Sequence, residues 1–195
     1  SFPEVAQEDF QVCGIYQEEG CRIRVYPDYG DMQTAVLGSS VREGEVVINT
    51  ATAAQVIRPS AEFLPGPYEI RPYFGNRYLY TISDMPSGRN LQVLIHFIQE
   101  TAEQVTGKSL SEPEVWETIH AFAGEEPEGL RVDMNFYRNS LFPGGGAITG
   151  ISRQNLRLGT LFAAAYQNMA ETYWDYIRIL AGSADRVTGI VCAGG

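Results

Sequence analysis

Cysteine, histidine and basic side chains are scarce in this chain. Its 195 residues include 3 Cys and 2 His, and 14 Lys and Arg stand against 24 Asp and Glu, which gives a net charge of −10. The three cysteines form no CxxC pair and leave one unpaired, so a reduced, cytoplasmic setting is the simplest interpretation. A chain this acidic is poorly suited to a polyphosphate backbone, and we expect no nucleic-acid partner.

Long apolar runs are also missing. No run approaches the roughly 20 apolar residues that a membrane helix needs, so we expect no membrane partner. Hydrophobic residues nevertheless make up 44% of the chain and aromatic residues 11%, which is enough for an ordinary core. We expect one α/β domain over residues 1–195, with residues 1–20 as a hinge segment and residues 21–195 as the folded unit.

Local patterns predict several of the elements. Ser87 is expected to cap a helix through Val105 that stops at Gly107. Ser111 and Glu114 have the spacing of a capping box, which predicts a second helix ending at Gly124. Alternation over residues 130–136 predicts a half-buried strand, and apolar periodicity predicts a long helix over about residues 155–180. The two histidines, His96 and His120, have no acid or nucleophile at a catalytic spacing, so we expect them to be solvated or packed.

Three predicted strands end in small or acidic residues. Residues 21–27 lead to Asp31 at a strand-to-helix switch, residues 45–49 run into a turn of small and hydroxyl residues, and residues 189–192 run into Gly194-Gly195. Small residues at a strand end allow backbone N–H groups to approach a phosphate. An acid at a neighbouring strand end could take a proton from an alcohol, although Asp31 taken alone could equally be a helix N-cap.

In this order the motifs resemble the C-terminal half of the FGGY carbohydrate kinases, which belong to the hexokinase–actin ATPase superfamily. Gly30-Asp31-Met32-Gln33 is similar to the family's Gly-Asp-x-Gln motif. Thr50-Ala-Thr-Ala53 is similar to its phosphate-facing Thr-Ser-Gly turn, and Gly194-Gly195 to its adenosine-binding loop. The resemblance implies a ribonuclease H-like, actin-like ATPase fold, in which helices flank a mixed sheet.

The resemblance also implies roles for individual residues. Asp31 would be the catalytic base, and Asp31, Met32 and Gln33 would lie beside the sugar. The residues implied to face the nucleotide are Gly30, Thr50, Thr52, Gly150, Gln154, Gly194 and Gly195. ATP and Mg²⁺ are the expected cofactors, and since no cluster of metal ligands is evident, Mg²⁺ would arrive with ATP and keep most of its waters.

One branch of the family is favoured. The short spacing from Thr149-Gly-Ile-Ser152 to Gly159, the segment from Asn49 to Gln55, and the tyrosines near Pro72 and Leu79 resemble the sedoheptulokinases. This implies transfer of the γ-phosphate of ATP to a primary hydroxyl of a ketose, with sedoheptulose favoured. The family's N-terminal domain supplies much of the sugar pocket, so we expect these 195 residues to be a C-terminal fragment that needs that missing domain and is inactive alone. A homodimer remains open.

Two departures from the family pattern keep a second interpretation open. Ala stands at both positions 53 and 54, where the family has Ser and Gly, which removes a hydroxyl donor and some backbone freedom. Residues 137–139 match the family's Gly-Glu-Arg poorly. The alternative is a non-catalytic, actin-like nucleotide-binding or interaction domain.

Overall fold

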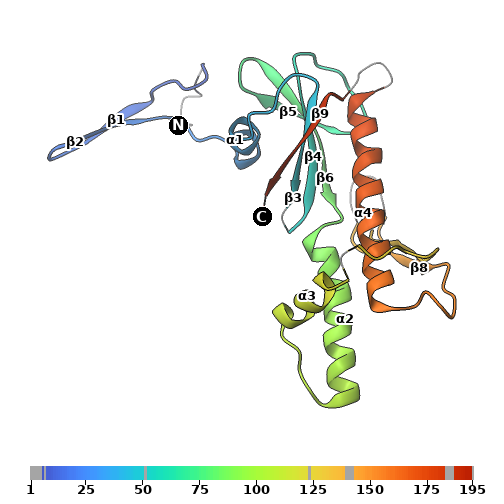
Figure 1. Cartoon of the computed structure of the whole chain (residues 1–195). Helices are drawn as coiled ribbons and strands as arrows, with labels where there is room; N and C mark the ends of the chain where they lie inside the picture. The colour runs from blue at the N-terminus through green and yellow to red at the C-terminus, as the bar shows by residue number, and fades with distance from the viewer. Residues whose placement is uncertain are drawn as a thin grey trace.

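A mixed five-stranded sheet forms the centre of the molecule, and helices pack on both of its faces (Figure 1). The structure is a computed structural model, and it describes residue 6 and residues 8–50, 52–122, 124–138, 143–182 and 187–194. The elements are β1 (Gly14–Glu18), β2 (Cys21–Val25), α1 (Asp31–Gly38), β3 (Glu45–Thr50), β4 (Ala54–Ser60), β5 (Glu69–Tyr73), β6 (Arg77–Met85), α2 (Gly88–Thr106), α3 (Glu112–His120), β7 (Arg131–Asp133), β8 (Ala147–Thr149), α4 (Leu158–Ala181) and β9 (Gly189–Gly194).

The strand order is β5-β6-β4-β3-β9. Strands β3 to β6 pair antiparallel, whereas β9 returns to lie parallel to β3, with Thr50 opposite Gly194. Since β4 is antiparallel to both of its neighbours, β3, β6 and β9 all run in one direction and end at the same edge of the sheet. We call this the C-terminal edge. It is the side of an α/β sheet where ligands commonly bind.

Each face of the sheet is covered by one helix. Helix α1 places Met32 and Val36 against Val47 of β3, Ile57 of β4 and Leu79 of β6. The opposite face packs on the C-terminal half of α4 through a separate set of buried side chains, which includes Val46, Ile48, Val56, Tyr80, Tyr176, Ile177 and Leu180. The two sets follow from the period of two along each strand, which sends alternate side chains to opposite faces.

A second core lies beyond the C-terminal edge. Helices α2 and α3, strand β7 and the N-terminal half of α4 bury a cluster that includes Leu94, Ile95, Ile119, Met134 and Phe162. Helix α2 begins where β6 ends, so its first turn lies between the sheet and this second core (Figure 1). The C-terminal edge therefore borders this second packed core and not open solvent alone.

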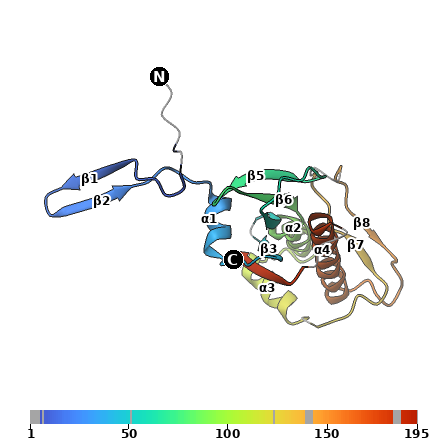
Figure 2. The ribbon, with the colours of Figure 1, turned by 90° about the horizontal axis from the view of Figure 1, so that it is seen from above.

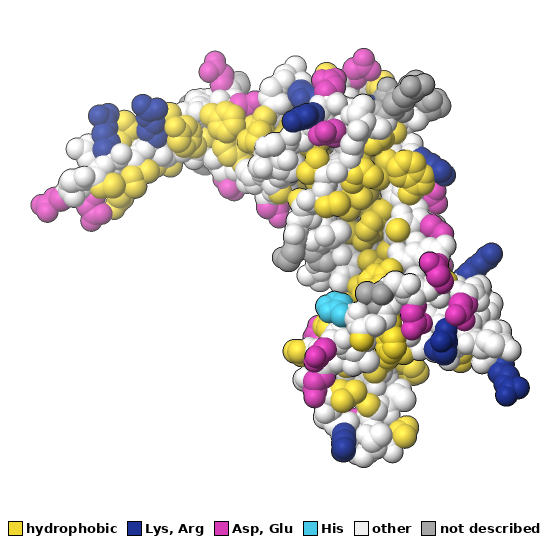
Figure 3. Space-filling view, viewed as in Figure 1, with side chains coloured by type: hydrophobic (Ala, Val, Ile, Leu, Met, Phe, Trp, Pro, Cys, Tyr) yellow, Lys and Arg dark blue, Asp and Glu magenta, His cyan; other side chains and the backbone are white. Residues whose placement is uncertain are grey.

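Strands β1 and β2 form a hairpin that projects away from the sheet in both ribbon views (Figures 1 and 2). It pairs Glu18 with Cys21, so an expected boundary between residues 20 and 21 would divide one hairpin. Exposed apolar side chains line this arm (Figure 3), among them Ile15, Tyr16, Ile23 and Val25.

The predicted helix caps are confirmed, but two helix ends differ from the prediction. Ser87 and Ser111 both form capping boxes, and Gly107 ends α2 in the left-handed conformation. Helix α3 stops at His120, before the expected Gly124. Helix α4 starts at Leu158 instead of 155, because Asn155 closes the preceding loop with its side chain.

The strand predicted over residues 130–136 is observed only as β7, residues 131–133. Just beyond it, the N–H of Met134 donates a hydrogen bond to Oδ1 of Asn168 on α4, at 2.9 Å. The carbonyl of the same residue accepts a hydrogen bond from the side chain of Asn90 on α2, at 2.6 Å. Two helices thus satisfy the backbone groups that a continuing strand would have used.

Candidate functional site

Asp31 is the first residue of α1, and Gly30 before it is the N-cap. The N-cap is therefore one residue earlier than the sequence suggested, at Gly30 and not at Asp31. Its Oδ1 accepts the N–H of Met32 at 2.7 Å, and the side chain is exposed. The positive end of the helix dipole favours a carboxylate at this position. Asp31 is thus an oriented, solvent-accessible carboxylate.

The two residues after Asp31 have structural partners. Met32 is 6% exposed and packs in the α1 face of the sheet, where its sulfur accepts a hydrogen bond from the hydroxyl of Thr81. The side chain of Met32 thus belongs to the core, and the position of Met32 beside the sugar stays a prediction. Gln33 donates from Nε2 to the carbonyl of Pro72 at 3.3 Å, which ties α1 to strand β5.

Asp31 lies at the N-terminal end of α1, which is the end of the helix nearer the C-terminal edge of the sheet. The other end of the helix, at Val36 and Leu37, borders the same surface hollow as Pro59 and Arg77, which lie away from that edge. Met32 lies over Thr81, nearer to the edge. Both ribbon views place α1 beside β9, and the side chain of Ala193 belongs to the same cluster as Met32 (Figures 1 and 2).

The ends of β3 and β9 meet closely at this edge. Thr50 pairs with Gly194, and its hydroxyl lies 3.5 Å from the carbonyl oxygen of Ala193. Gly194 has a φ of 108°, and a Cβ added to it would overlap the carbonyl oxygen of Thr50. Only glycine fits this close approach of two backbones. The predicted ligand Gly195 lies outside the described residues.

Thr52 joins the turn after β3 to helix α2. Its carbonyl accepts the N–H of Arg89 at 3.0 Å, and its side chain is exposed. The guanidinium of Arg89 lies 3.3 Å from Asp84 and stacks over the ring of Tyr137. Sequence reasoning missed Arg89, a cation near this edge, because its position follows only from the contact between the turn and α2.

A row of polar side chains lies on the face of the sheet that α1 covers, close to the C-terminal edge. Asn49 and Gln55 are direct partners across β3 and β4, and Ser83 lies on β6 in the bulge that opposes Gln55. Alternation with Val47, Ile57 and Thr81 places all three on the face that α1 covers. Sequence reasoning gave these residues no role, since the row exists only once the strands are paired.

Gly150 and Gln154 lie elsewhere, in the loop between β8 and α4. Gly150 has a φ of 70°, and a Cβ there would overlap the carbonyl oxygen of Gly129, so the backbone geometry accounts for this glycine. Gln154 is exposed. Figure 2 shows α4 between β9 and the β7–β8 hairpin.

Asn155 holds that loop together. It is 3% exposed, its Oδ1 accepts the N–H of Ser152 at 2.7 Å, and its Nδ2 donates to the carbonyls of Gly150 and Glu128 at 2.9 and 3.1 Å. Replacing Asn155 with Ala would leave buried backbone groups without partners. We expect a loss of about 2 kcal/mol of stability.

For a domain of this size that loss corresponds to a melting temperature lower by about 4–8 °C, measurable by scanning calorimetry. Gln154→Ala is the matched control, because Gln154 is exposed and only its backbone N–H has a contact in the same loop. A drop in Asn155→Ala no larger than the control's would contradict the role of Asn155.

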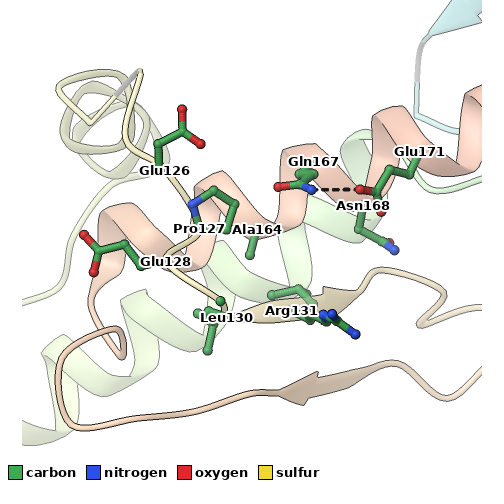
Figure 4. Close-up of a pocket in the computed structure, with 11 residues that line it drawn as sticks. Glu126, Pro127, Glu128, Leu130, Arg131, Ala164, Gln167, Asn168 and Glu171 are labelled. Atoms are coloured by element: carbon green, nitrogen blue, oxygen red, sulfur yellow. Dashed lines mark hydrogen bonds between the residues drawn. The ribbon is translucent and has the colours of Figure 1, made fainter.

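A cavity of about 630 Å³ lies outside this edge, between α4, β7 and the loop before it. Its lining includes Glu126, Glu128, Arg131 and Glu171. Figure 4 shows that the carboxylates of Glu126 and Glu128 point away from Arg131. In the described residues, no group of three or more His, Cys, Asp or Glu side chains is arranged to hold a metal ion. The described helices include none that is long and apolar enough to cross a membrane.

Comparisons with known proteins give structural neighbours only. No family model matches the chain, and no curated protein sequence matches it. The xylulose kinase of Rhodospirillum rubrum is similar over 90% of this chain and 36% of its own, with a TM-score of 0.72 and 18% identity. The glycerol kinase of Plasmodium falciparum, solved with ADP, is similar over 96% of this chain and 39% of its own, with a TM-score of 0.69 and 13% identity.

Further neighbours agree with these two. A xylulose kinase from Brucella ovis has a TM-score of 0.72 at 12% identity, covering 96% of this chain and 40% of its own. The present chain thus spans 36 to 40% of the length of these three kinases. Its mixed sheet flanked by helices is the fold expected from the sequence: the chain has the sugar-kinase, actin-like ATPase fold.

Proposed function

We propose that this chain is the C-terminal, nucleotide-side part of an ATP-dependent carbohydrate kinase of the FGGY type. The observation that supports this most is that Asp31 lies on the same sheet face, and towards the same edge, as the joined ends of β3 and β9. A carboxylate beside a glycine-lined strand end suits the transfer of phosphate to an alcohol. The acid can accept the alcohol's proton, and the bare backbone can approach a phosphate.

In the proposed reaction, a primary hydroxyl of the sugar attacks the γ-phosphorus of ATP. The new O–P bond forms as the bond to the β,γ-bridging oxygen breaks, ADP leaves, and Asp31 takes the hydroxyl proton. Thr50, Thr52 and the strand end at Gly194 would lie against the phosphates, with Gly30 at the start of α1 beside them. Such transfers depend mainly on positioning and on neutralising charge, and less on the strength of the base.

Mg²⁺ would neutralise charge on the phosphates. Of the described carboxylates towards this edge, Asp31 is exposed and bonded to the N–H of Met32, and Asp84 is exposed and paired with Arg89. This donor set fits a Mg²⁺ ion that arrives with ATP and keeps most of its waters. We propose no dedicated metal site in the protein.

The acceptor we propose is a ketose, with sedoheptulose favoured. This rests on the likeness of the segments around Asn49 and Gly159 to the sedoheptulokinases, and on the ketose kinases among the structural neighbours. Most sugar contacts would come from an N-terminal domain outside this chain, so the activity is proposed for the full-length protein. A reduced, cytoplasmic setting suits its three free cysteines.

The test is a transfer assay on the full-length protein with γ-labelled ATP. Sedoheptulose and xylulose should accept label at the primary hydroxyl, and sedoheptulose should have the higher kcat/KM. Glycerol and gluconate, the acceptors of other kinases with this fold, are the comparison substrates. Nucleotide binding without transfer to any acceptor would overturn the proposal and favour the non-catalytic, actin-like alternative.

A further inference from the structure

Two side-chain oxygens on the sheet face that α1 covers are buried and have no hydrogen-bond partner in the described part of the chain. They are Oε1 of Gln55 on β4 and Oγ of Ser83 on β6. Buried polar atoms in native proteins are nearly always paired, and an orphan costs stability. Two of them on neighbouring strands, on the same face of the sheet, therefore call for a specific explanation.

The backbone around these residues is shaped to bring them together. The β4–β6 register shifts between Ala54 and Val56, so that the single residue Gln55 opposes both Ser83 and Asp84. Asp84 has a φ of 58°, an uncommon conformation for a residue other than glycine. Bulges of this kind often re-aim a side chain beside a functional site.

Both oxygens lie on the face that α1 covers. Along each strand they are two residues closer to the C-terminal edge than the buried residues under α1. Thr81, which contacts Met32, is two residues before Ser83 on the same strand, and Ile57 of the α1 cluster is two residues after Gln55. Asp31 is the residue next to Met32 at the end of α1 nearer that edge. The orphan oxygens therefore lie on the side of Asp31 where the substrates of the proposed reaction would meet.

The hydrogen-bonding groups of Gln55 and Ser83 suit one of the two substrates, the sugar, better than the other, ATP. An amide oxygen can only accept a hydrogen bond, and an ionised phosphate has only acceptors to offer. A sugar hydroxyl can donate to Gln55 and also accept from Ser83. The pair therefore suits a polyol and is poorly suited to the phosphates of ATP.

We propose that Gln55 and Ser83 bind a hydroxyl of the acceptor sugar next to the one that is phosphorylated, and so help to select the acceptor. This rests on the proposed kinase function. The two residues are specificity-determining contacts supplied by the C-terminal domain. The stability lost to two orphan oxygens in the free protein is recovered when the sugar is bound.

The experiment compares Gln55→Met and Ser83→Ala with the wild type in the full-length protein, using sedoheptulose and xylulose as acceptors. Methionine matches the length of glutamine but cannot form its hydrogen bonds. In each variant we expect kcat/KM for the ketose to fall about 10- to 30-fold, with the KM for ATP within about twofold of wild type. The melting temperature without ligands should stay level or rise, because an orphan polar atom has been removed.

Gln167→Met is the matched control, since Gln167 is exposed on α4 and is bonded only to Glu171 in the described structure. It should leave all of these values unchanged. A ketose lacking the hydroxyl next to the phosphorylated carbon gives a second readout. The wild type should discriminate against this analogue, and Gln55→Met should lose most of that discrimination.

The outcomes separate this inference from the function on which it rests. Transfer by the wild type with unchanged ketose kinetics in both variants would overturn the role of Gln55 and Ser83 alone. A lower melting temperature with equal losses for ATP and ketose would also overturn it, because it would indicate a purely structural role. No transfer by the wild type to any acceptor would overturn both proposals.

Discussion

Replacing Asp31 with Asn in the full-length protein should lower kcat for sugar phosphorylation by about 10²- to 10⁴-fold, the usual contribution of a positioned general base. The amide has nearly the same shape as the carboxylate and can still accept the N–H of Met32, so α1 should keep its first turn. ATP affinity should stay within about twofold of wild type, because the base acts on the hydroxyl and not on the nucleotide. Steady-state rates with labelled ATP, together with nucleotide titration, measure both quantities.

Asp28→Asn is the control for that variant. Asp28 is exposed in the loop before α1, three residues before Asp31. The control makes the same change in charge close to the site without touching the proposed base, so it should keep nearly full activity. Equal losses in the two variants would point to a general electrostatic effect. Unchanged turnover in Asp31→Asn would remove Asp31 from the mechanism.

Replacing Gly194 with Ala should have the largest effect on stability. The new Cβ would overlap the carbonyl oxygen of Thr50, and the φ of 108° is strained for any residue with a side chain. We expect a cost of about 3 kcal/mol, since a strained backbone and a backbone overlap add. Because the ends of β3 and β9 must then separate, ADP affinity should fall as well, by about tenfold or more.

Scanning calorimetry and nucleotide titration of the full-length protein test this prediction. For Gly194→Ala we expect the melting temperature to drop by about 6–12 °C. Gly38→Ala is the control, because a Cβ at Gly38 meets no atom within 4 Å and its φ is not positive. It should be neutral or slightly stabilising, as alanine favours a helix more than glycine does. If Gly194→Ala behaves like Gly38→Ala, the close approach of the two strand ends is not needed.

Features set by neighbouring residues could be predicted from the sequence. The caps at Ser87 and Ser111 and the stop at Gly107 depend on residues within one helical turn, and the structure has them. The strand after Cys21 and the strand before Gly194 also formed where alternation and apolar runs predicted them. The prediction that Asp31 and the strand ends form one site came from the family resemblance and the order of the motifs.

Features set by distant residues could not be predicted in the same way. The polar row with Gln55 and Ser83 depends on the β4–β6 register and its bulge, which no local pattern specifies. The short length of β7 depends on side chains of α2 and α4 that take the hydrogen bonds of Met134. For Met32 a local signal existed, since its spacing from Val36 is that of a buried helix face, but the motif match outweighed it.

The most direct measurement of the central claim is a crystal structure of the full-length protein with a ketose and a nonhydrolysable ATP analogue. We predict a carboxylate oxygen of Asp31 about 3 Å from the primary hydroxyl of the sugar, with the γ-phosphate against Thr52 and the β3–β9 strand ends. A sugar or γ-phosphate bound away from Asp31, on another face of the sheet, would contradict it.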